Sequence, residues 1–372
     1  MPLVSLIIPT KNEAETICEV IQRATLVFEE MDLDGEILVV DSSIDKTAEI
    51  AESCGARVIH PKKLGYGNAY LQGFEKANGE YIMLMDGDMT YDPKELNEFL
   101  TLLLSGDFDM VMGSRFKGKI LPGSMPLLHR YVGNPFLTWL LNSLFPSGIS
   151  DVHCGMRAIT HDAMKKLQLK TGGMEFASEM VIEATRKGLR ISEVPITYYP
   201  RRGESKLNTF SDGWRHLRFI LLYRPVLYLL VPGGLALMLG LALTAGVYMQ
   251  GGSRMHSLML GSLMLLIGYQ MLLAGLYFEA FGEIYGFSSS AINKKLISYH
   301  SLEKELLLGF AFLATGAIIG LQVLLKWQAR GFGSIDEMGS AVMAMVLSLM
   351  GIQTIISGMS ISLLLLNNEQ QD

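Results

Sequence analysis

The chain has 372 residues and a formal net charge of −6, which excludes the overall basic character of a nucleic-acid-binding protein. No nucleic-acid partner is therefore expected. Charged residues are scattered through residues 1–224 but nearly disappear from long stretches after Arg224. A chain of this length fits two domains, and the shift in composition predicts a soluble-type domain followed by a membrane domain.

The cysteines and the first residues of the chain bear on its cellular compartment. Cys18, Cys54 and Cys154 are widely spaced and odd in number, which predicts free thiols in a reducing compartment and no zinc site. The N-terminal run MPLVSLIIPTKNE lacks both a basic segment before its apolar residues and a small-residue cleavage site. We therefore expect it to form a first strand rather than a signal peptide.

The N-terminal half alternates short apolar runs, typical of strands, with helical patterns. Strands are expected at 4–8, 36–40, 57–59, 81–85 and 109–112. Helices are expected at about 13–29, 46–54, 67–77 and 93–104. This alternation predicts a mostly parallel sheet with helices on both faces. Ligands on such sheets bind beyond the carboxyl ends of the strands, and polar clusters follow three of the expected strands there.

The expected strand at 81–85 leads directly into Asp86-Gly87-Asp88. Two carboxylates separated by one residue at a strand end reach the same polar point, which suits a divalent cation that bridges a diphosphate. An ordinary turn is the alternative, because Asp-Gly-Asp is also common turn chemistry. Since further acids stand at neighbouring strand ends, we favour a site for Mg²⁺ or Mn²⁺.

Other residues at these strand ends suit a nucleotide. Asp41 ends the second strand, where its carboxylate is placed to accept hydrogen bonds from a base or a ribose. Asp45 is expected to cap the following helix instead, and capping is also the alternative for Glu13. The segment 62–69 places two glycines before a helix, a pattern that lets backbone approach phosphate closely and directs helix amides at anions.

A segment ahead of the membrane domain has the pattern of an amphipathic helix at 209–225. Its apolar residues at helical spacing are Phe210, Trp214, Leu217 and Leu221. Its basic or titratable residues away from that stripe are Arg215, His216 and Arg218. The pattern predicts a helix in the membrane interface, with a helix docked on the sheet domain as the alternative. Residues 124–145, also rich in apolar residues, fit a lipid-facing segment and a core helix equally well.

Four uncharged segments follow, at about 226–248, 257–278, 306–325 and 338–366. Each is long enough to cross a hydrocarbon core of ~30 Å as a helix. Buried hairpins of a soluble core are the alternative, but such helices rarely lack charges over this length. The segments contain few polar residues, such as Gln270, Gln322 and Gln353, and no internal charge, so a substrate pathway through them is poorly supported.

Basic residues predict the orientation of these spans. The loop between the second and third spans carries Lys294, Lys295 and Lys304, and the soluble domain is rich in Lys and Arg. The other two loops carry only Arg254, and Lys326 with Arg330. The bias predicts a multi-pass protein of the cell membrane with its soluble domain in the cytoplasm.

The polar motifs, in their order and spacing, resemble those of glycosyltransferase family 2. They read S-L-I-I-P-T-K-N-E, V-V-D-S-S-I-D-K-T, G-Y-G-N-A-Y-L-Q-G-F, G-E-Y-I-M-L-M-D-G-D and M-G-S-R-F. D-V-H-C-G-M-R at 151–157 and R-G-E-S-K at 202–206 are similar to the polyprenyl-phosphate branch, which includes dolichyl-phosphate mannose and glucose synthases. The resemblance covers about residues 1–225 and implies a GT-A catalytic domain, an α/β fold, over residues 1–208.

The resemblance implies inverting transfer of a sugar from a nucleotide-sugar to a polyprenyl or dolichyl phosphate, with a divalent cation as cofactor. The bilayer is then a further partner, and a homo-oligomer stays open. The implied donor-binding residues are Pro9, Thr10, Glu13, Asp41, Lys63, Gly65, Asp86, Arg202 and Lys206. The implied acceptor-phosphate residues are Ser114, Arg115 and Arg130. Asp88 is the implied metal ligand, and the implied catalytic set is Asp86, Asp88 and Arg115.

Two departures from the mannose-type pattern favour a UDP-sugar over GDP-mannose. Met89-Thr90 stands where those members carry Leu-Gln, and Ser42 stands where they carry a second acid. A processive polysaccharide synthase is one alternative, but its Q-x-x-R-W motif is missing from the sequence. A flippase for lipid-linked sugars and an inactive scaffold are the others, and the scaffold requires Asp86-Gly87-Asp88 to be idle.

Overall fold

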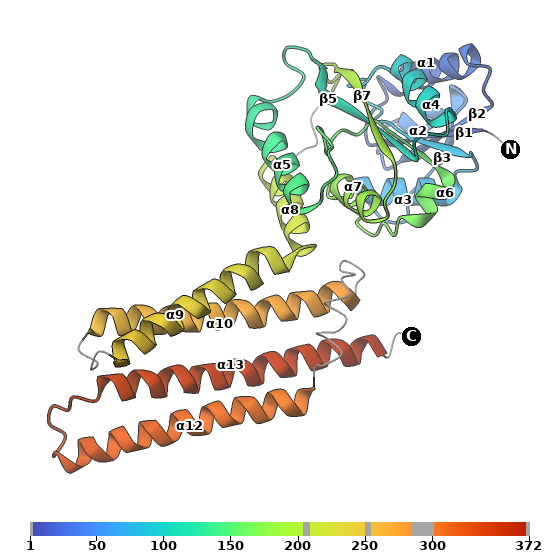
Figure 1. The fold of residues 1–372 in the computed structure, drawn as a ribbon. Helices are drawn as coiled ribbons and strands as arrows, with labels where there is room; N and C mark the ends of the chain where they lie inside the picture. The colour runs from blue at the N-terminus through green and yellow to red at the C-terminus, as the bar shows by residue number, and fades with distance from the viewer. Residues whose placement is uncertain (1–2, 204–208, 250–253, 285–300, 370–372) are drawn as a thin grey trace. The chain divides into compact units, whose positions relative to one another are not determined.

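The protein is described by a computed structural model, which covers residues 3–203, 209–249, 254–284 and 301–369 (Figure 1). The chain divides into two compact units, Met1–Ile220 and Leu221–Asp372. The first is an α/β unit and the second consists of long helices. The expected succession of an α/β domain and a helical membrane domain is therefore confirmed.

The α/β unit is built on a seven-stranded sheet in the order β3-β2-β1-β4-β6-β5-β7. The strands are β1 Val4–Thr10, β2 Gly35–Asp41, β3 Arg57–Ile59, β4 Tyr81–Leu84, β5 Met110–Ile120, β6 Arg157–Thr160 and β7 Ile191–Tyr198. Parallel pairing joins β3, β2, β1 and β4, and also β5 with β7. Only β6 runs antiparallel, between β4 and β5. The sheet is thus mostly parallel, as the strand–helix alternation predicts.

Helices cover both faces of this sheet (Figure 1). The helices of the α/β unit are α1 Ile17–Glu30, α2 Thr47–Ser53, α3 Tyr66–Lys76, α4 Leu96–Leu104, α5 Asn134–Leu144, α6 His161–Lys166, α7 Phe176–Arg186 and α8 Thr209–Leu222, of which α5 and α8 lie beside the sheet. In α1 the buried residues recur every three or four positions, so one apolar stripe faces the core. The strands at the centre of the sheet are apolar almost throughout because both of their faces are covered.

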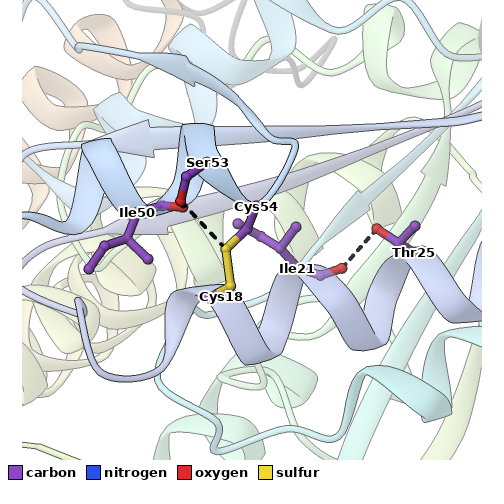
Figure 2. The surroundings of a disulfide bond; sticks show 6 residues. All are labelled: Cys18, Ile21, Thr25, Ile50, Ser53 and Cys54. Atoms are coloured by element: carbon purple, nitrogen blue, oxygen red, sulfur yellow. Dashed lines mark hydrogen bonds between the residues drawn. A yellow bond between two sulfur atoms is a disulfide. The ribbon is translucent and has the colours of Figure 1, made fainter.

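The prediction of three free thiols is wrong for two of them. Cys18 on α1 and Cys54 at the end of α2 form a disulfide, with their Cα atoms 5.7 Å apart (Figure 2). Cys154 is free and buried. The bond arises because α1 and α2 pack against each other, which the spacing of cysteines in the sequence does not reveal. A closed loop of this size stabilises the fold by about 3–4 kcal/mol, and the cysteines give no argument for a reducing compartment.

The second unit contains four helices that are long and apolar enough to cross a membrane. After a short turn at Val226–Leu230, they are α9 Val231–Met249, α10 Met255–Ile284, α12 Leu302–Ala329 and α13 Met338–Glu369. All four predicted spans are confirmed as helices. Glycines allow close packing within each hairpin: a Cβ at Gly240 would lie 2.8 Å from the carbonyl oxygen of Gly261, and one at Gly351 would lie 2.7 Å from that of Gly309.

The helices of this unit extend beyond the predicted spans, which themselves carry no charge. The longer apolar segment Met255–Gly282 of α10 therefore also contains Glu279, which is buried. The Tyr269 hydroxyl of α10 also lies 2.7 Å from Oγ1 of Thr354 on α13, which ties the two hairpins together. A buried acid and an interhelical hydrogen bond make the membrane unit more than a uniform apolar anchor.

Candidate active site

The carboxyl ends of β1, β2 and β4 meet at one edge of the sheet, as the parallel pairing requires. Thr10 and Asp41 are register partners at the ends of β1 and β2, and Asp86 follows β4. Thr10 Oγ1 donates a hydrogen bond of 2.7 Å to Asp41 Oδ1, and the Ser43 amide donates one of 3.2 Å to Oδ2. Asp41 is therefore buried, and its carboxylate is held in place by donors at the end of β1 and in the loop after β2.

The loops after β1 and β2 are tied to each other at this edge. The Asn12 amide donates to Ser43 Oγ at 2.7 Å, and the Glu13 amide donates to Thr47 Oγ1 at 2.9 Å. Asp45 accepts a 3.0 Å hydrogen bond from the Thr47 amide at the start of α2, which is the capping role expected for it. Since the first helix begins at Ile17, the residues before it are a turn and not the helix expected from Glu13.

The two aspartates after β4 lie in different surroundings. Asp88 Oδ1 accepts hydrogen bonds from the amide and the hydroxyl of Thr90, and Asp88 Oδ2 lies 2.7 Å from Nη2 of Arg201. Asp86 Oδ1 accepts a hydrogen bond of 3.2 Å from the Tyr66 hydroxyl. Burial, together with the charge of Asp88, raises the pKa of Asp86 to about 7. The pair is thus short of positive charge.

Two glycines allow the surrounding backbone to close around these carboxylates. A Cβ at Gly87 would lie 2.6 Å from Oε2 of Glu13, and one at Gly155 would lie 2.8 Å from Oδ2 of Asp86. The Gly155 amide donates a 2.9 Å hydrogen bond to the Tyr91 hydroxyl, which holds Gly155 in place. Glu13, predicted on the donor side, therefore lies beside the Asp86-Gly87-Asp88 turn.

The donor set at this turn fits a hard divalent cation. Among the residues that the structure describes, no group of three or more His, Cys, Asp or Glu side chains could hold a metal ion. Asp86 and Asp88 together offer carboxylate oxygens only, and Mg²⁺ and Mn²⁺ prefer oxygen ligands completed by phosphate and water. Two carboxylates leave the other coordination positions to water or to phosphate, so the site suits a cation that a nucleotide diphosphate can share.

The glycines of the 62–69 segment lie close to backbone of another segment. A Cβ at Gly65 would lie 2.2 Å from the Gly172 carbonyl oxygen, and one at Gly67 would lie 2.1 Å from that of Thr171. This contact accounts for both glycines, and the approach of phosphate to the same segment stays a prediction. Gly65 also has a backbone φ of +136°, which residues with a side chain rarely adopt. Lys63, on the same segment, is exposed.

A second site lies on β5 and the segment that follows it. Arg115 is buried and forms two hydrogen bonds with Asp151, Nε to Oδ2 at 2.7 Å and Nη2 to Oδ1 at 2.8 Å. Arg130 lies in the helical turn His129–Gly133. Both arginines line one cavity of about 250 Å³. The two arginines predicted for the acceptor phosphate are thus brought together, and Arg115 is also held in an ion pair with Asp151.

Apolar side chains surround this cavity. A neighbouring cavity of about 510 Å³ shares Phe116 and Pro135 with it and runs along α5 past Trp139. The exposed apolar side chains of this region are Leu127, Leu128, Tyr131, Val132, Phe136 and Trp139. Leu137 and Leu141 point inward, so the segment 124–145 is half core and half exposed apolar surface. Ser114, the third predicted acceptor residue, is buried and lies 2.6 Å from Ser150 by their Oγ atoms.

Helix α8 forms where it was expected, and the face that it packs against the α/β unit contains His216. His216 is buried and its Nδ1 lies 2.8 Å from Ser178 Oγ, while the His153 ring packs edge-on at 4.5 Å. Trp214 of the predicted apolar stripe is 61% exposed. Burial lowers the pKa of His216 to about 4, so it is neutral at pH 7. His216, which was expected away from the apolar stripe, therefore makes the contact with α7, because its neutral imidazole pairs with the buried hydroxyl of Ser178.

The basic residues after β7 are also placed differently from the expectation. Arg202, predicted to contact the donor, is exposed and forms an ion pair of 2.7 Å with Glu19. Its neighbour Arg201 forms the ion pair with Asp88. The sequence reasoning missed this role, although Arg201 and Arg202 are adjacent in the chain. Lys206 lies outside the described residues. Asp151 was also missed, and its signal was its place at the start of the D-V-H-C-G-M-R motif.

The chain is similar to known families in both of its units. Residues 5–168 match the family described as "Glycosyl transferase family 2", and residues 279–365 match "Glycosyltransferase family 2 C-terminal transmembrane region". The low-salt glycan biosynthesis hexosyltransferase Agl6 of Haloferax volcanii is 41% identical over 359 residues, covering 95% of this chain and 87% of that protein. The dolichyl-phosphate hexose transferase of the same organism is 33% identical over 210 residues, covering 56% of this chain and 88% of that protein.

Solved structures share the fold of the first unit. A mycobacterial protein and the mannosyl-3-phosphoglycerate synthase of Rubrobacter xylanophilus both superpose with a TM-score of 0.50. They are 22% and 20% identical, and each match covers 60% of this chain and 74% of the other. At such identities the likeness shows the fold alone.

Proposed function

This chain belongs to glycosyltransferase family 2, and we propose that it transfers a sugar from a nucleotide-sugar to a polyprenyl or dolichyl phosphate, with inversion. The product is a lipid-linked monosaccharide. One observation carries the proposal: the acidic turn after β4 and a cavity lined by two arginines belong to the same unit, so one unit offers sites for two anionic substrates. The hexosyltransferase and dolichyl-phosphate hexose transferase names of its relatives support the same class of reaction.

The donor is assigned to the edge formed by β1, β2 and β4. Asp41, with Pro9 and Thr10 beside it, receives the nucleoside, because its carboxylate accepts hydrogen bonds from ribose or base donors. Asp86 and Asp88 would hold a divalent cation, which would neutralise the charge of the leaving nucleoside diphosphate. Lacking the second acid at Ser42 and the Gln at Thr90, the site is assigned to a UDP-sugar rather than GDP-mannose.

The acceptor phosphate is assigned to the cavity lined by Arg115 and Arg130. A guanidinium fork binds phosphate oxygens bidentately, and Asp151 holds the Arg115 fork in one orientation. A phosphate monoester has a second pKa of about 6, so it is largely dianionic near neutral pH. It attacks the anomeric carbon without a strong general base, which agrees with buried neutral His153 and His216 as structural residues.

The apolar surface beside this cavity suits the lipid part of the acceptor. Trp139 and Phe136 stand on α5, next to the larger cavity that adjoins the phosphate cavity. A prenyl chain gains about 25 cal/mol for each Å² of apolar surface that it covers there. The four spans anchor the enzyme in the membrane, and the lysine bias supports a cytoplasmic catalytic unit. Two of the three lysines on which this bias depends, Lys294 and Lys295, lie outside the described residues.

The test uses the purified full chain with Mg²⁺ or Mn²⁺, a short polyprenyl phosphate, and labelled UDP- and GDP-sugars. We expect one UDP-sugar to pass its label into the lipid phase and EDTA to stop the transfer. The Asp41→Asn variant then separates donor recognition from chemistry, because it raises the donor KM about tenfold through one lost charged hydrogen-bond acceptor. No label in lipid from any donor, together with no nucleotide hydrolysis, would contradict the proposal.

A further inference from the structure

The two oxygens of the Asp88 carboxylate have different partners. Oδ1 is taken by two donors of Thr90, its amide at 3.0 Å and its hydroxyl. Oδ2 is buried, and Nη2 of Arg201 lies 2.7 Å from it. The Asp88 side chain is 2% exposed, whereas that of Arg201 is 23% exposed. Of the two contacts, the one made by Arg201 therefore opens toward solvent.

Backbone hydrogen bonds hold Arg201 over this carboxylate. The Tyr199 amide donates to the Thr90 carbonyl at 2.9 Å, and the Arg202 amide donates to the Asp88 carbonyl at 3.4 Å. The chain after β7 therefore runs along the turn after β4, with Arg201 between its two points of attachment. The position of the guanidinium follows from this pairing and is not an accident of a long side chain on the surface.

We propose that Arg201 is a built-in cation of the Asp88 site, and that a divalent metal ion must displace its guanidinium to reach Oδ2. A divalent ion bound to this carboxylate lies within a few ångströms of the guanidinium position, where like charges repel strongly at low dielectric. Asp88 is neutralised by Arg201 before the metal ion arrives. Metal binding and release of the Arg201 side chain are therefore one event, and the released guanidinium is free to pair with an anion.

Arg202 provides a matched control one residue away. It carries the same charge on the same segment, but it pairs with Glu19 at 2.7 Å and its side chain is 57% exposed. Its removal changes the net charge of the protein as much as removal of Arg201 does. A difference between the two variants is therefore due to the contact with Asp88 and not to the general electrostatic field.

The first experiment measures Mn²⁺ binding to the full chain by electron paramagnetic resonance, without nucleotide. Arg201→Gln is expected to bind Mn²⁺ about tenfold more tightly than the wild type, because the competing charge is gone. Arg202→Gln and Arg201→Lys are expected to stay within about twofold of the wild type, since both keep a cation at position 201. Equal affinities of Arg201→Gln and Arg202→Gln would overturn the proposal, provided that both variants melt at the wild-type temperature.

The second experiment reads the Arg201 side chain directly by modification with phenylglyoxal, followed by peptide mass spectrometry. Addition of Mn²⁺ is expected to raise the modification rate of Arg201 several-fold and leave that of Arg202 unchanged. In Asp88→Asn, whose side chain carries no charge to hold the guanidinium, Arg201 is expected to react quickly with or without Mn²⁺. A rate at Arg201 that does not respond to Mn²⁺ in the wild type contradicts the displacement.

The inference rests on the metal site of the proposed function, and the outcomes separate the two. Mn²⁺ binding by the wild type that Arg201→Gln does not tighten leaves the metal site intact and removes only the role of Arg201. If neither protein binds Mn²⁺ and transfer continues in EDTA, the metal assignment itself fails, and the inference fails with it. Mn²⁺ binding by Arg201→Gln alone supports the inference in its strongest form.

Discussion

The donor edge and the acceptor cavity handle charge in opposite ways. The donor edge gathers acids, with Asp41, Asp86 and Asp88 at neighbouring strand ends, although a nucleotide-sugar is itself an anion. The acceptor cavity gathers arginines, and the buried Asp151 behind it orients one of them. A diphosphate at an acidic edge requires an added cation, whereas a phosphate among arginines does not. We therefore expect use of the sugar donor to depend on a metal ion, and binding of the acceptor phosphate to depend on arginines of the protein.

The largest effect is expected at the donor edge, from Asp88→Ala. Loss of the carboxylate removes the metal contact, so transfer should fall by about 10³-fold or more. Because Arg201, the partner of Asp88, is partly exposed and can turn toward solvent, the protein should stay folded and membrane-bound. Labelled transfer and thermal unfolding of the same preparation measure both. Full activity in this variant would remove the mechanism proposed for the donor.

The next effect is expected on the acceptor side, from Arg115→Lys. A lysine lacks the fork that meets both oxygens of Asp151, so the acceptor KM should rise about 10–100-fold while the donor KM changes little. The surface pair of Arg190 and Asp109 is also bidentate and supplies the control, because Arg190→Lys should leave both constants unchanged. A weakened donor with normal acceptor use would reverse the assignment of the two sites.

Removal of the disulfide tests whether the donor edge can be disturbed without the acceptor cavity. Cys18 and Cys54 join α1 and α2, the helices that follow the two donor loops, and neither helix lines the acceptor cavities. The double change to serine should lower the free energy of unfolding by about 3 kcal/mol. Unfolding in detergent measures this loss, and kinetics near room temperature should show a raised donor KM with an unchanged acceptor KM. A larger change in acceptor KM would contradict the separation of the two regions.

A smaller effect concerns pH in the absence of metal. The pKa of Asp86 is raised from the usual 3.8 to about 7 by burial and by Asp88, so between these values the folded protein holds a proton that the unfolded chain has lost. The free energy of unfolding should therefore fall as pH rises from about 4 to about 7, by at most about 1.4 kcal/mol per pH unit. Unfolding in EDTA measures the slope, and Asp86→Asn should flatten it.

Local pattern was enough to predict most of the scaffold. β1, apart from Ser5, and β4 are apolar runs that lead into polar residues, and the four membrane helices need only length and apolar composition. The Asp86-Gly87-Asp88 turn was found because two acids directly follow a buried strand. In each case the property that determines the structure lies within one short segment.

Contacts between distant segments account for what was missed. Cys18 meets Cys54, Arg115 meets Asp151 and Asp88 meets Arg201 only because the sheet order brings their elements together. On α8, hydrophobicity predicts the apolar stripe. It does not predict that His216 is buried, because the neutral imidazole of His216 is accommodated by its hydrogen bond with Ser178. Such pairs depend on register and helix packing, which no single segment records.

The most direct measurement of the central claim compares two acceptors of equal prenyl length, one a polyprenyl phosphate and the other the corresponding polyprenol. The full chain would receive the same labelled donor and Mn²⁺ in both. Because the acceptor cavity offers arginines and no general base is assigned, label should enter lipid only with the phosphate. Equal transfer to the alcohol would contradict the account, since a hydroxyl acceptor requires a base and no fixed positive charge.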